Sequence, residues 1–455
     1  MVGQLGERAV AHDDPYAGKL TSPEAAVSVV QPGQRVVIPI GSNPLLLAEA
    51  LALRLARDLA GTEGVEIAHC AAAGNYAWFE QGYPGVRSVV HEHWGSPAVR
   101  KYLRARLHDH LPIPFAQRFK GRDEAAADVR TPAEGRDADV VLVQVSPPDE
   151  HGYLSLGMPW NQTGFIESAR FALGEVSERV PRCYGENLIH VSKFHALVLN
   201  NSPRTVTARE FVPTENQRRI ASYVAEIVRD GDTLQLGAGV VGTAVAFAGA
   251  FDAKRDLGWH SETTLGRIID LIERGVITGE RKSLDRGKAV SSSFVGSDRQ
   301  IAFVRMNPRI EVRPTSYVHN LRTIAAQENM VAINVGLAVD LTGQITAESI
   351  GYELMGGAGG QTEFVIGALN AKNGRSITVL ESTALGGAES RIMPGFPPGT
   401  SVTVPRMYAD MVVTEHGVAR LWGKSLRERA KELIRIAHPR FRDQLTRQAH
   451  EVCGL

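Results

Sequence analysis

A glycine-rich turn followed by a single glutamate is the pattern in this sequence best suited to chemistry. The segment Gly237-Ala238-Gly239-Val240-Val241-Gly242 has the spacing G-x-G-x-x-G, and Glu262 follows its last glycine by 20 positions. Glycines let backbone N–H groups approach an anion at the start of a helix. That anion is either the pyrophosphate of a dinucleotide or an oxyanion that develops during a reaction. Tight packing without a ligand also explains the motif, so three interpretations stay open.

A second glycine cluster runs from Gly356 to Gly360 and directly precedes Gln361. Consecutive glycines free the backbone to present N–H groups around an anion. A flexible loop is the alternative interpretation. If donors from both glycine segments face one developing oxyanion, each contributes on the order of 3 kcal/mol to its stabilisation.

The glycine turn belongs to a plan of helix, turn, short apolar strand, glycine turn and helix that occurs twice. The first copy begins at the helix cap Ser22 before Pro23 and reaches an apolar strand at 36–40. The second begins at a capping box between Thr214 and Gln217 and reaches a strand at 233–236. The repetition predicts two related α/β domains, although chance similarity of α/β units is the alternative.

Further short apolar runs predict strands at 65–69, 140–145, 188–191, 332–335 and 377–380. Their alternation with helices predicts a mostly parallel sheet in each half. A capping box between Ser425 and Glu428 begins a helical tail over 426–436. We place the domains at 1–205 and 206–455, with Glu262 and the helical tail in the second.

Composition narrows the class of protein. The 455 residues are 43% hydrophobic and 22% charged, which is ordinary globular usage and long enough for several domains. Lys plus Arg equals Asp plus Glu at 50 each, so no global positive charge attracts nucleic acid or an anionic membrane. The three cysteines, Cys70, Cys183 and Cys453, lack metal or redox spacing, and the first 20 residues lack an apolar signal core. A cytoplasmic protein is expected.

Several ordered segments resemble the acetyl-CoA hydrolase/transferase family, nearest its 4-hydroxybutyrate CoA-transferase-like branch. In the first half the similar segment is VSPPDEHGYLSLG at 145–157. In the second half they are DGDTLQLGAG at 230–239, LGWHSE at 257–262, LIERGVITGERKSLDRGKAV at 271–290, NMVAINVGLAVDLTGQITAESIG at 329–351, GAGGQTEFVIGA at 357–368 and VVTEHGVARLWGKSLRERAKELIRIAHPRF at 412–441. The resemblance spans most of the chain.

The resemblance implies two tandem α/β domains of the CoA-transferase superfold, with the active site at their interface and a homodimer or larger homo-oligomer. It implies that Glu262 attacks an acyl-CoA thioester, forming an acyl-glutamyl anhydride and then a glutamyl-CoA thioester. A second carboxylic acid reverses these steps. Coenzyme A is then a co-substrate, and neither a metal nor NAD is needed.

The resemblance also assigns roles around Glu262. The loop of Gly237, Ala238, Gly239, Val240 and Val241 would contact CoA, and Asn334, Gly359 and Gly360 would lie beside the thioester. The Ala238 and Gly360 amides would act as oxyanion donors, and Glu415 would supply a second carboxylate.

The run Thr263 to Arg267 departs from the family pattern after the nucleophile and leaves the acceptor acid open. Three other functions remain. Acyl-CoA hydrolysis follows if water reaches the intermediates. A nicotinamide-dependent oxidoreductase would use the Gly237 turn for the dinucleotide and Glu262 for a ribose hydroxyl. A non-catalytic CoA-binding protein is the third.

Overall fold

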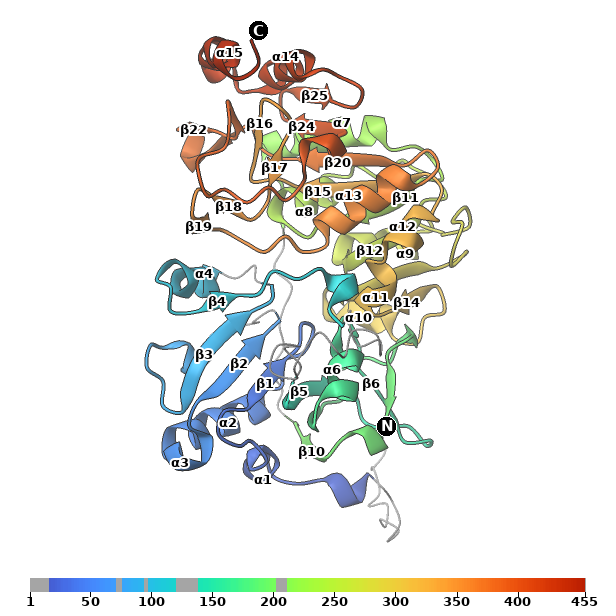
Figure 1. Cartoon of the computed structure of the whole chain (residues 1–455). Helices are drawn as coiled ribbons and strands as arrows, with labels where there is room; N and C mark the ends of the chain where they lie inside the picture. The colour runs from blue at the N-terminus through green and yellow to red at the C-terminus, as the bar shows by residue number, and fades with distance from the viewer. Residues whose placement is uncertain (1–15, 71–75, 94–96, 120–137, 202–210, 455) are drawn as a thin grey trace.

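The computed structural model describes residues 16–70, 76–93, 97–119, 138–201 and 211–454. Two α/β domains lie one above the other in Figure 1, the first in blue to green and the second in yellow-green to red. The expected boundary near 205 falls at 202–210, outside the described residues. In the described ranges, no helix combines the length and apolar character needed to cross a membrane.

The first domain is built on a seven-stranded parallel sheet with the order β10-β7-β5-β1-β2-β3-β4. Its strands are β1 (Arg35–Ile38), β2 (Val65–His69), β3 (Val86–His91), β4 (Asp109–His110), β5 (Val140–Val145), β7 (Phe171–Val176) and β10 (Ala196–Leu199). Its helices include α1 (Pro23–Val27), α2 (Leu45–Arg57), α4 (Pro97–Arg104) and α6 (Gln162–Ser168).

The two faces of β1 explain why the strands of the first sheet are apolar at successive positions in the sequence. Val36 and Ile38 pack into one core cluster, and Val37 packs into another. Both faces are therefore covered, as expected of a parallel sheet between helices. The predicted strands at 36–40, 65–69 and 140–145 are confirmed.

The second domain holds a nine-stranded sheet with the order β25-β24-β20-β15-β11-β12-β13-β14-β8, parallel except between β24 and β25. Its strands are β8 (Tyr184–Gly185), β11 (Thr233–Leu236), β12 (Gly258–Leu265), β13 (Ala289–Val295), β14 (Ile310–Val312), β15 (Met330–Val335), β20 (Arg375–Val379), β24 (Met411–Thr414) and β25 (Gly417–Arg420). Its helices include α7 (Glu215–Ile227), α8 (Val240–Phe247), α9 (Gly266–Glu273), α11 (Thr315–Val318), α12 (Leu321–Ala325), α13 (Gln361–Asn370), α14 (Leu426–Ile436) and α15 (Pro439–Cys453).

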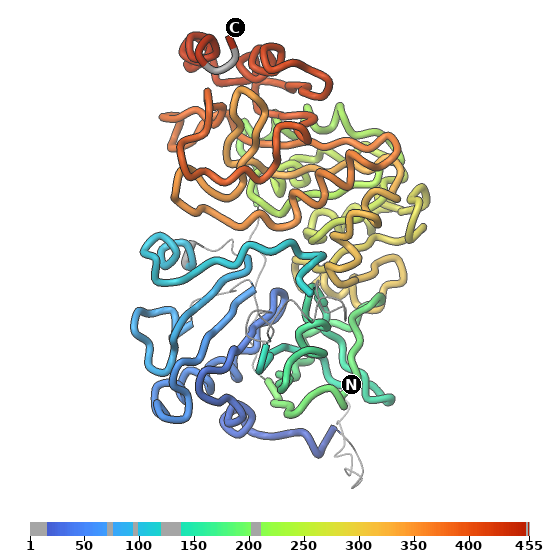
Figure 2. Tube along the Cα trace, in the orientation of Figure 1, coloured from blue at the N-terminus to red at the C-terminus, as the bar shows by residue number. Residues whose placement is uncertain are grey.

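Two local predictions in this domain are confirmed. The capping boxes of Thr214 with Gln217 and of Ser425 with Glu428 begin α7 and α14. The helical tail lies at the end of the second domain that is farthest from the first, as the tube in Figure 2 shows.

Residues 184–190 differ from the expected arrangement. The predicted strand at 188–191 exists as β9 (Leu188–His190), but it pairs antiparallel with β6 (Tyr153–Ser155) and does not join the parallel sheet of the first domain. Just before it, β8 pairs with β14 at the edge of the second sheet. Such short strands take their partners from tertiary contacts, because two or three residues carry no periodicity that selects a sheet.

Candidate active site

Three of the expected site residues form one row across the second sheet. The register of β11 against β15 puts Leu236 opposite Ile333, so the next residues, Gly237 and Asn334, are neighbours. Against β12, Leu234 lies opposite Trp259, and the same register continued places Gly237 beside Glu262. Adjacent strands are about 4.8 Å apart. The glycine turn, Asn334 and Glu262 therefore meet where β11 and β15 end.

The carboxylate of Glu262 is held by two hydrogen-bond donors. Its Oε2 lies 3.1 Å from Nε2 of His319, the residue that follows α11. The backbone amide of Gly360 is the second donor. Gly360 caps the N-terminus of the ten-residue helix α13, so the positive end of the helix dipole also favours the negative charge.

These contacts decide the ionisation of Glu262. Burial has the largest single effect on the pKa of Glu262, and it raises that pKa. The hydrogen bond and charge of His319, the charge of His93 and the Gly360 amide all lower the pKa, and their combined effect is larger than that of burial. The pKa of the Glu262 carboxyl consequently lies below its ordinary value. The group is an anion at neutral pH, the state that a carboxylate nucleophile requires.

The second glycine cluster is glycine because histidine rings pass close to it. A Cβ on Gly360 would lie 2.3 Å from Cδ2 and 2.5 Å from Nε2 of His319. A Cβ on Gly357 would lie 2.7 Å from Nδ1 of His93, and Gly359 has a positive φ of 58°. These contacts explain the glycines at 357 and 360, where the missing side chains make room for the histidine rings.

The first glycine turn is open to a ligand. Ala238 and Gly239 are exposed, and Val240 is 64% exposed at the start of α8. Gly242 has a different function, since a Cβ there would lie 2.1 Å from the carbonyl oxygen of Gly237. Packing thus explains one glycine of the motif and leaves the exposed amides available for an anion or for CoA.

Asn334 lies beneath this turn and is 4% exposed. Its side-chain amide exchanges two hydrogen bonds with that of Gln235, at 3.0 and 3.1 Å. The paired amides hold β15 against β11 directly below Gly237. Asn334 therefore fixes the floor of the site.

The first domain closes the site from the opposite side. His93 follows β3 and lies close enough to Glu262 for the negative carboxylate to stabilise a positive charge on the His93 ring. Phe115 and Trp160 pack against the ring of His319, with centroids 5.3 and 6.5 Å away. Burial lowers the pKa of His93, although the Glu262 carboxylate opposes that shift. Residues of both domains thus surround the glutamate.

A second buried carboxylate, Glu363 in the first turn of α13, joins the domains at this point. Its Oε1 accepts a hydrogen bond of 3.1 Å from the Ala116 amide, whereas its Oε2 has no partner among the described residues. Burial raises the pKa of Glu363, and the neighbouring Glu262 carboxylate raises it further, although His319 acts in the opposite direction.

Of the residues after Glu262 that depart from the family pattern, those from Thr263 to Leu265 belong to β12, whereas Gly266 and Arg267 begin α9. The Thr263 hydroxyl lies 2.7 Å from Ser293 Oγ, and the Thr264 hydroxyl donates to Ser291 Oγ at 2.8 Å. Both serines are on β13. This hydroxyl pairing anchors the strand that carries the glutamate.

The structure does not bring Glu415 together with Glu262. Glu415 follows β24, four strands from β12, which corresponds to roughly 19 Å at the usual strand spacing. Its carboxylate accepts hydrogen bonds from the amide and the hydroxyl of Ser382, at 2.9 and 2.5 Å. These bonds join the loops that follow β20 and β24.

Sequence reasoning missed three residues of this site: His93, His319 and Glu363. His93 stands in the run His91-Glu92-His93 at the end of a strand, and this cluster of polar residues was a usable signal. His319 and Glu363 stand alone in the sequence, so only the fold reveals their contact with Glu262.

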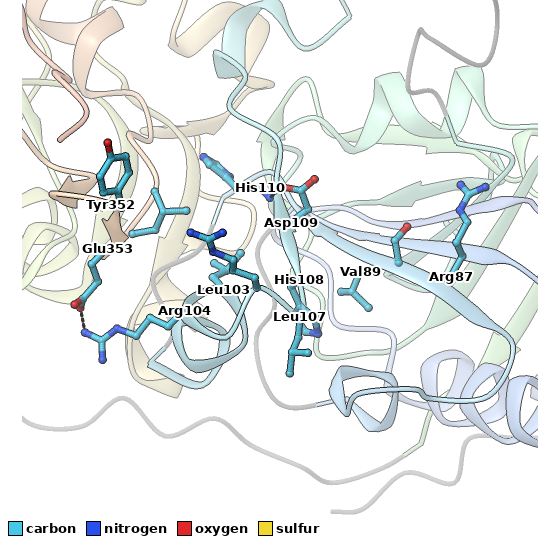
Figure 3. Close-up of a pocket in the computed structure, with 13 residues that line it drawn as sticks. Arg87, Val89, Leu103, Arg104, Leu107, His108, Asp109, His110, Tyr352 and Glu353 are labelled. Atoms are coloured by element: carbon cyan, nitrogen blue, oxygen red, sulfur yellow. Dashed lines mark hydrogen bonds and ion pairs between the residues drawn. The ribbon is translucent and has the colours of Figure 1, made fainter. Parts of the chain in front are cut away.

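A cavity of about 750 Å³ lies at another part of the domain interface, between the edge of the first sheet and the hairpin of β18 (Ser349–Ile350) and β19 (Glu353–Leu354). Figure 3 shows Arg104 reaching from the first domain to Glu353 of the second, with Tyr352 nearby. None of the expected site residues lines this cavity. It is therefore distinct from the surroundings of Glu262.

Comparison with known proteins supplies the family. The acetyl-CoA hydrolase/transferase N-terminal domain model matches residues 6–216, and the C-terminal domain model matches residues 296–449. The 4-hydroxybutyrate coenzyme A transferase of Clostridium kluyveri is 36% identical over 94% of this chain and 97% of its own length. The succinyl-CoA:cyclohexane-1-carboxylate CoA transferase of Geobacter metallireducens is 34% identical over 97% of both chains.

Among solved structures, RipA from Yersinia pestis superimposes with a TM-score of 0.85 at 32% identity, covering 97% of this chain and 99% of RipA. The similarity extends through both α/β domains and confirms the expected fold. The chain is therefore an enzyme of the acetyl-CoA hydrolase/transferase family, and CoA-transferases are its full-length relatives.

Proposed function

We propose that this enzyme moves CoA from an acyl-CoA to a small carboxylic acid by a ping-pong mechanism, with Glu262 as the covalent nucleophile. The observation that carries the proposal is the position of the Glu262 carboxylate at the domain interface, with its Oε2 3.1 Å from Nε2 of His319 and beside Gly360. A carboxylate is a weak nucleophile, but fixed orientation and exclusion of water allow it to form a covalent intermediate.

The first half-reaction has two steps. Glu262 attacks the thioester carbonyl, which releases CoA thiolate and leaves an acyl-glutamyl anhydride. The thiolate then attacks the glutamyl carbonyl, which releases the first acid and leaves a glutamyl-CoA thioester. A second carboxylate reverses both steps, so the energy of the thioester is retained.

The loop from Gly237 to Val241 is proposed to bind the CoA arm, with the Ala238 amide facing the oxyanion at the acyl carbonyl. Its exposure at the start of α8 supports that role. Gly359 and Gly360 are proposed to line the opposite side. Binding energy from the distant parts of CoA can then be used at the reacting carbons.

Hydrolysis requires water at the anhydride or thioester, and transfer is favoured because the full-length relatives at 34% identity or more are CoA-transferases. The nicotinamide interpretation gives His319, His93 and Gly360 no role, and the full-length relatives use CoA. The cytoplasmic location and the homodimer or larger assembly stay predictions.

The test is a steady-state exchange assay with acyl-CoA donors and a panel of acids that includes acetate, 4-hydroxybutyrate and cyclohexane-1-carboxylate. We expect parallel double-reciprocal lines and loss of exchange in Glu262→Gln. Glu273→Gln, at the partly exposed end of α9, serves as the matched control and should remain active. Intersecting lines, or full exchange by Glu262→Gln, would overturn the proposal.

A further inference from the structure

The two oxygens of the Glu262 carboxylate have different surroundings. Oε2 lies 3.1 Å from Nε2 of His319, and it faces the second glycine segment, since a Cβ added to Gly360 or Gly359 would lie 3.3 or 3.8 Å from it. A carboxylate oxygen can only accept hydrogen bonds, so Nε2 of His319 must carry the hydrogen and donate it. An attacking oxygen needs a free lone pair, so Oε1 is the better nucleophile.

The His319 ring is fixed in this orientation by its surroundings. The side chain is fully buried, and the rings of Phe115 and Phe364 lie 5.3 and 5.1 Å from it. Its Nδ1 has no hydrogen-bond partner among the described residues. The only polar contact described for the ring is therefore the one to Glu262, and the aromatic walls leave the ring little room to rotate.

The different surroundings of the two oxygens determine which of them bridges the anhydride, if Glu262 is the nucleophile of the proposed function. If Oε1 attacks the acyl carbon, Oε1 becomes the bridging oxygen of the anhydride and Oε2 becomes the glutamyl carbonyl oxygen. When CoA thiolate bonds to Cδ of Glu262, the electron pair of the carbonyl moves onto Oε2. Collapse restores the carbonyl, breaks the bond from Cδ to Oε1 and releases the acid with Oε1. No proton is transferred.

We propose that His319 is a catalytic residue, whose Nε2–H and the Gly360 amide together form the oxyanion hole for Oε2. The same two donors act again when the second carboxylate attacks Cδ of the thioester, since the negative charge returns to Oε2. They are in place before the reaction and enclosed, which is the arrangement that makes such donors effective. His319 thus acts on the glutamyl carbon, whereas the Gly237 turn acts on the acyl carbon of the substrate.

The test compares three replacements of His319 in the full-length enzyme. His319→Gln keeps an N–H donor at a similar reach, His319→Asn keeps the amide but is too short, and His319→Leu removes the donor. We expect the single-turnover rate of glutamyl-CoA thioester formation, measured by borohydride trapping, to fall about 10²- to 10³-fold in Leu and Asn. The Gln variant should recover most of the rate, and KM for acyl-CoA should change little in all three.

The three variants separate a chemical role from a structural one. If His319→Leu does not fold, the comparison of Gln with Asn decides the question, because both are polar and differ in reach. Equal rates in Gln and Asn, or a normal rate in Leu, would overturn the role of His319. A wild-type enzyme that forms no trappable thioester would overturn the proposed function itself, so the two failures are distinguishable.

Discussion

The replacement Gly360→Ala probes the crowding around Glu262 directly. The new Cβ would lie 2.3 Å from Cδ2 of His319, 2.5 Å from its Nε2 and 3.3 Å from Oε2 of Glu262. The φ of Gly360 is −90°, which alanine adopts readily, so backbone strain does not contribute. His319 is fully buried against aromatic rings and cannot move aside easily.

Two effects of different size follow from Gly360→Ala. Overpacking in a filled core costs about 1–3 kcal/mol of the free energy of unfolding. Displacing the donors that face Oε2 should lower kcat by about 10²- to 10³-fold, the loss seen when one oxyanion donor is removed. Catalysis should therefore suffer more than stability.

The assay combines denaturant unfolding with the exchange rate under saturating acyl-CoA. Gly395→Ala is the matched control in the same domain, because an added Cβ meets nothing within 4 Å and φ is not positive. The control should match the wild type in both measurements. Wild-type kcat in Gly360→Ala would contradict the crowding around His319, since the described contacts leave no room for the methyl group.

Three further predictions concern charge and pH. Glu363→Gln keeps an acceptor for the Ala116 amide, so exchange should persist. The pKa of Glu363 is raised and that of Glu262 is lowered, so Glu363 is already neutral where Glu262 titrates and the acid limb of the kcat/KM profile should not move. A shift of that limb, or a loss of exchange as large as that of Glu262→Gln, would contradict this. Glu415→Gln should lower the free energy of unfolding by roughly 1–3 kcal/mol through its bonds to Ser382 and change kcat little, which urea unfolding and the exchange assay measure. Burial lowers the pKa of His91 and of His260 to about 3. Below pH 6.5 the unfolded state therefore binds more protons than the folded state. As the pH is lowered from 6.5, the free energy of unfolding should fall by up to about 1.4 kcal/mol per pH unit for each histidine. A urea midpoint that does not change between pH 6.5 and 4 would contradict the burial.

Local patterns predicted much of the fold because they depend on neighbouring residues. The capping boxes at Thr214 and Ser425 and the strand that leads into Gly237 are confirmed for that reason. Strand β8 joins the second sheet through a pairing 127 residues away along the chain, from Tyr184 to Glu311, and no local pattern contains that information.

The site residues also fall into those that a local pattern predicts and those that only distant contacts bring together. The sequence pointed to Glu262, Asn334 and both glycine segments, because each stands in a motif or at a strand end. His319 was missed because its importance arises from a ring packed against Gly360, a contact that only the fold creates. Glu415 stands in a segment that resembles the family, but the order of the strands separates it from Glu262.

In the proposed mechanism, Glu262 carries the covalent intermediate. The most direct measurement incubates the enzyme with acyl-CoA alone, reduces the mixture with borohydride and maps the modified peptide by mass spectrometry. We expect reduction of the Glu262 side chain in the wild type and none in His319→Leu at the same early time. An unmodified Glu262 peptide in an enzyme that is exchanging CoA, or a modification on another carboxylate, would contradict it.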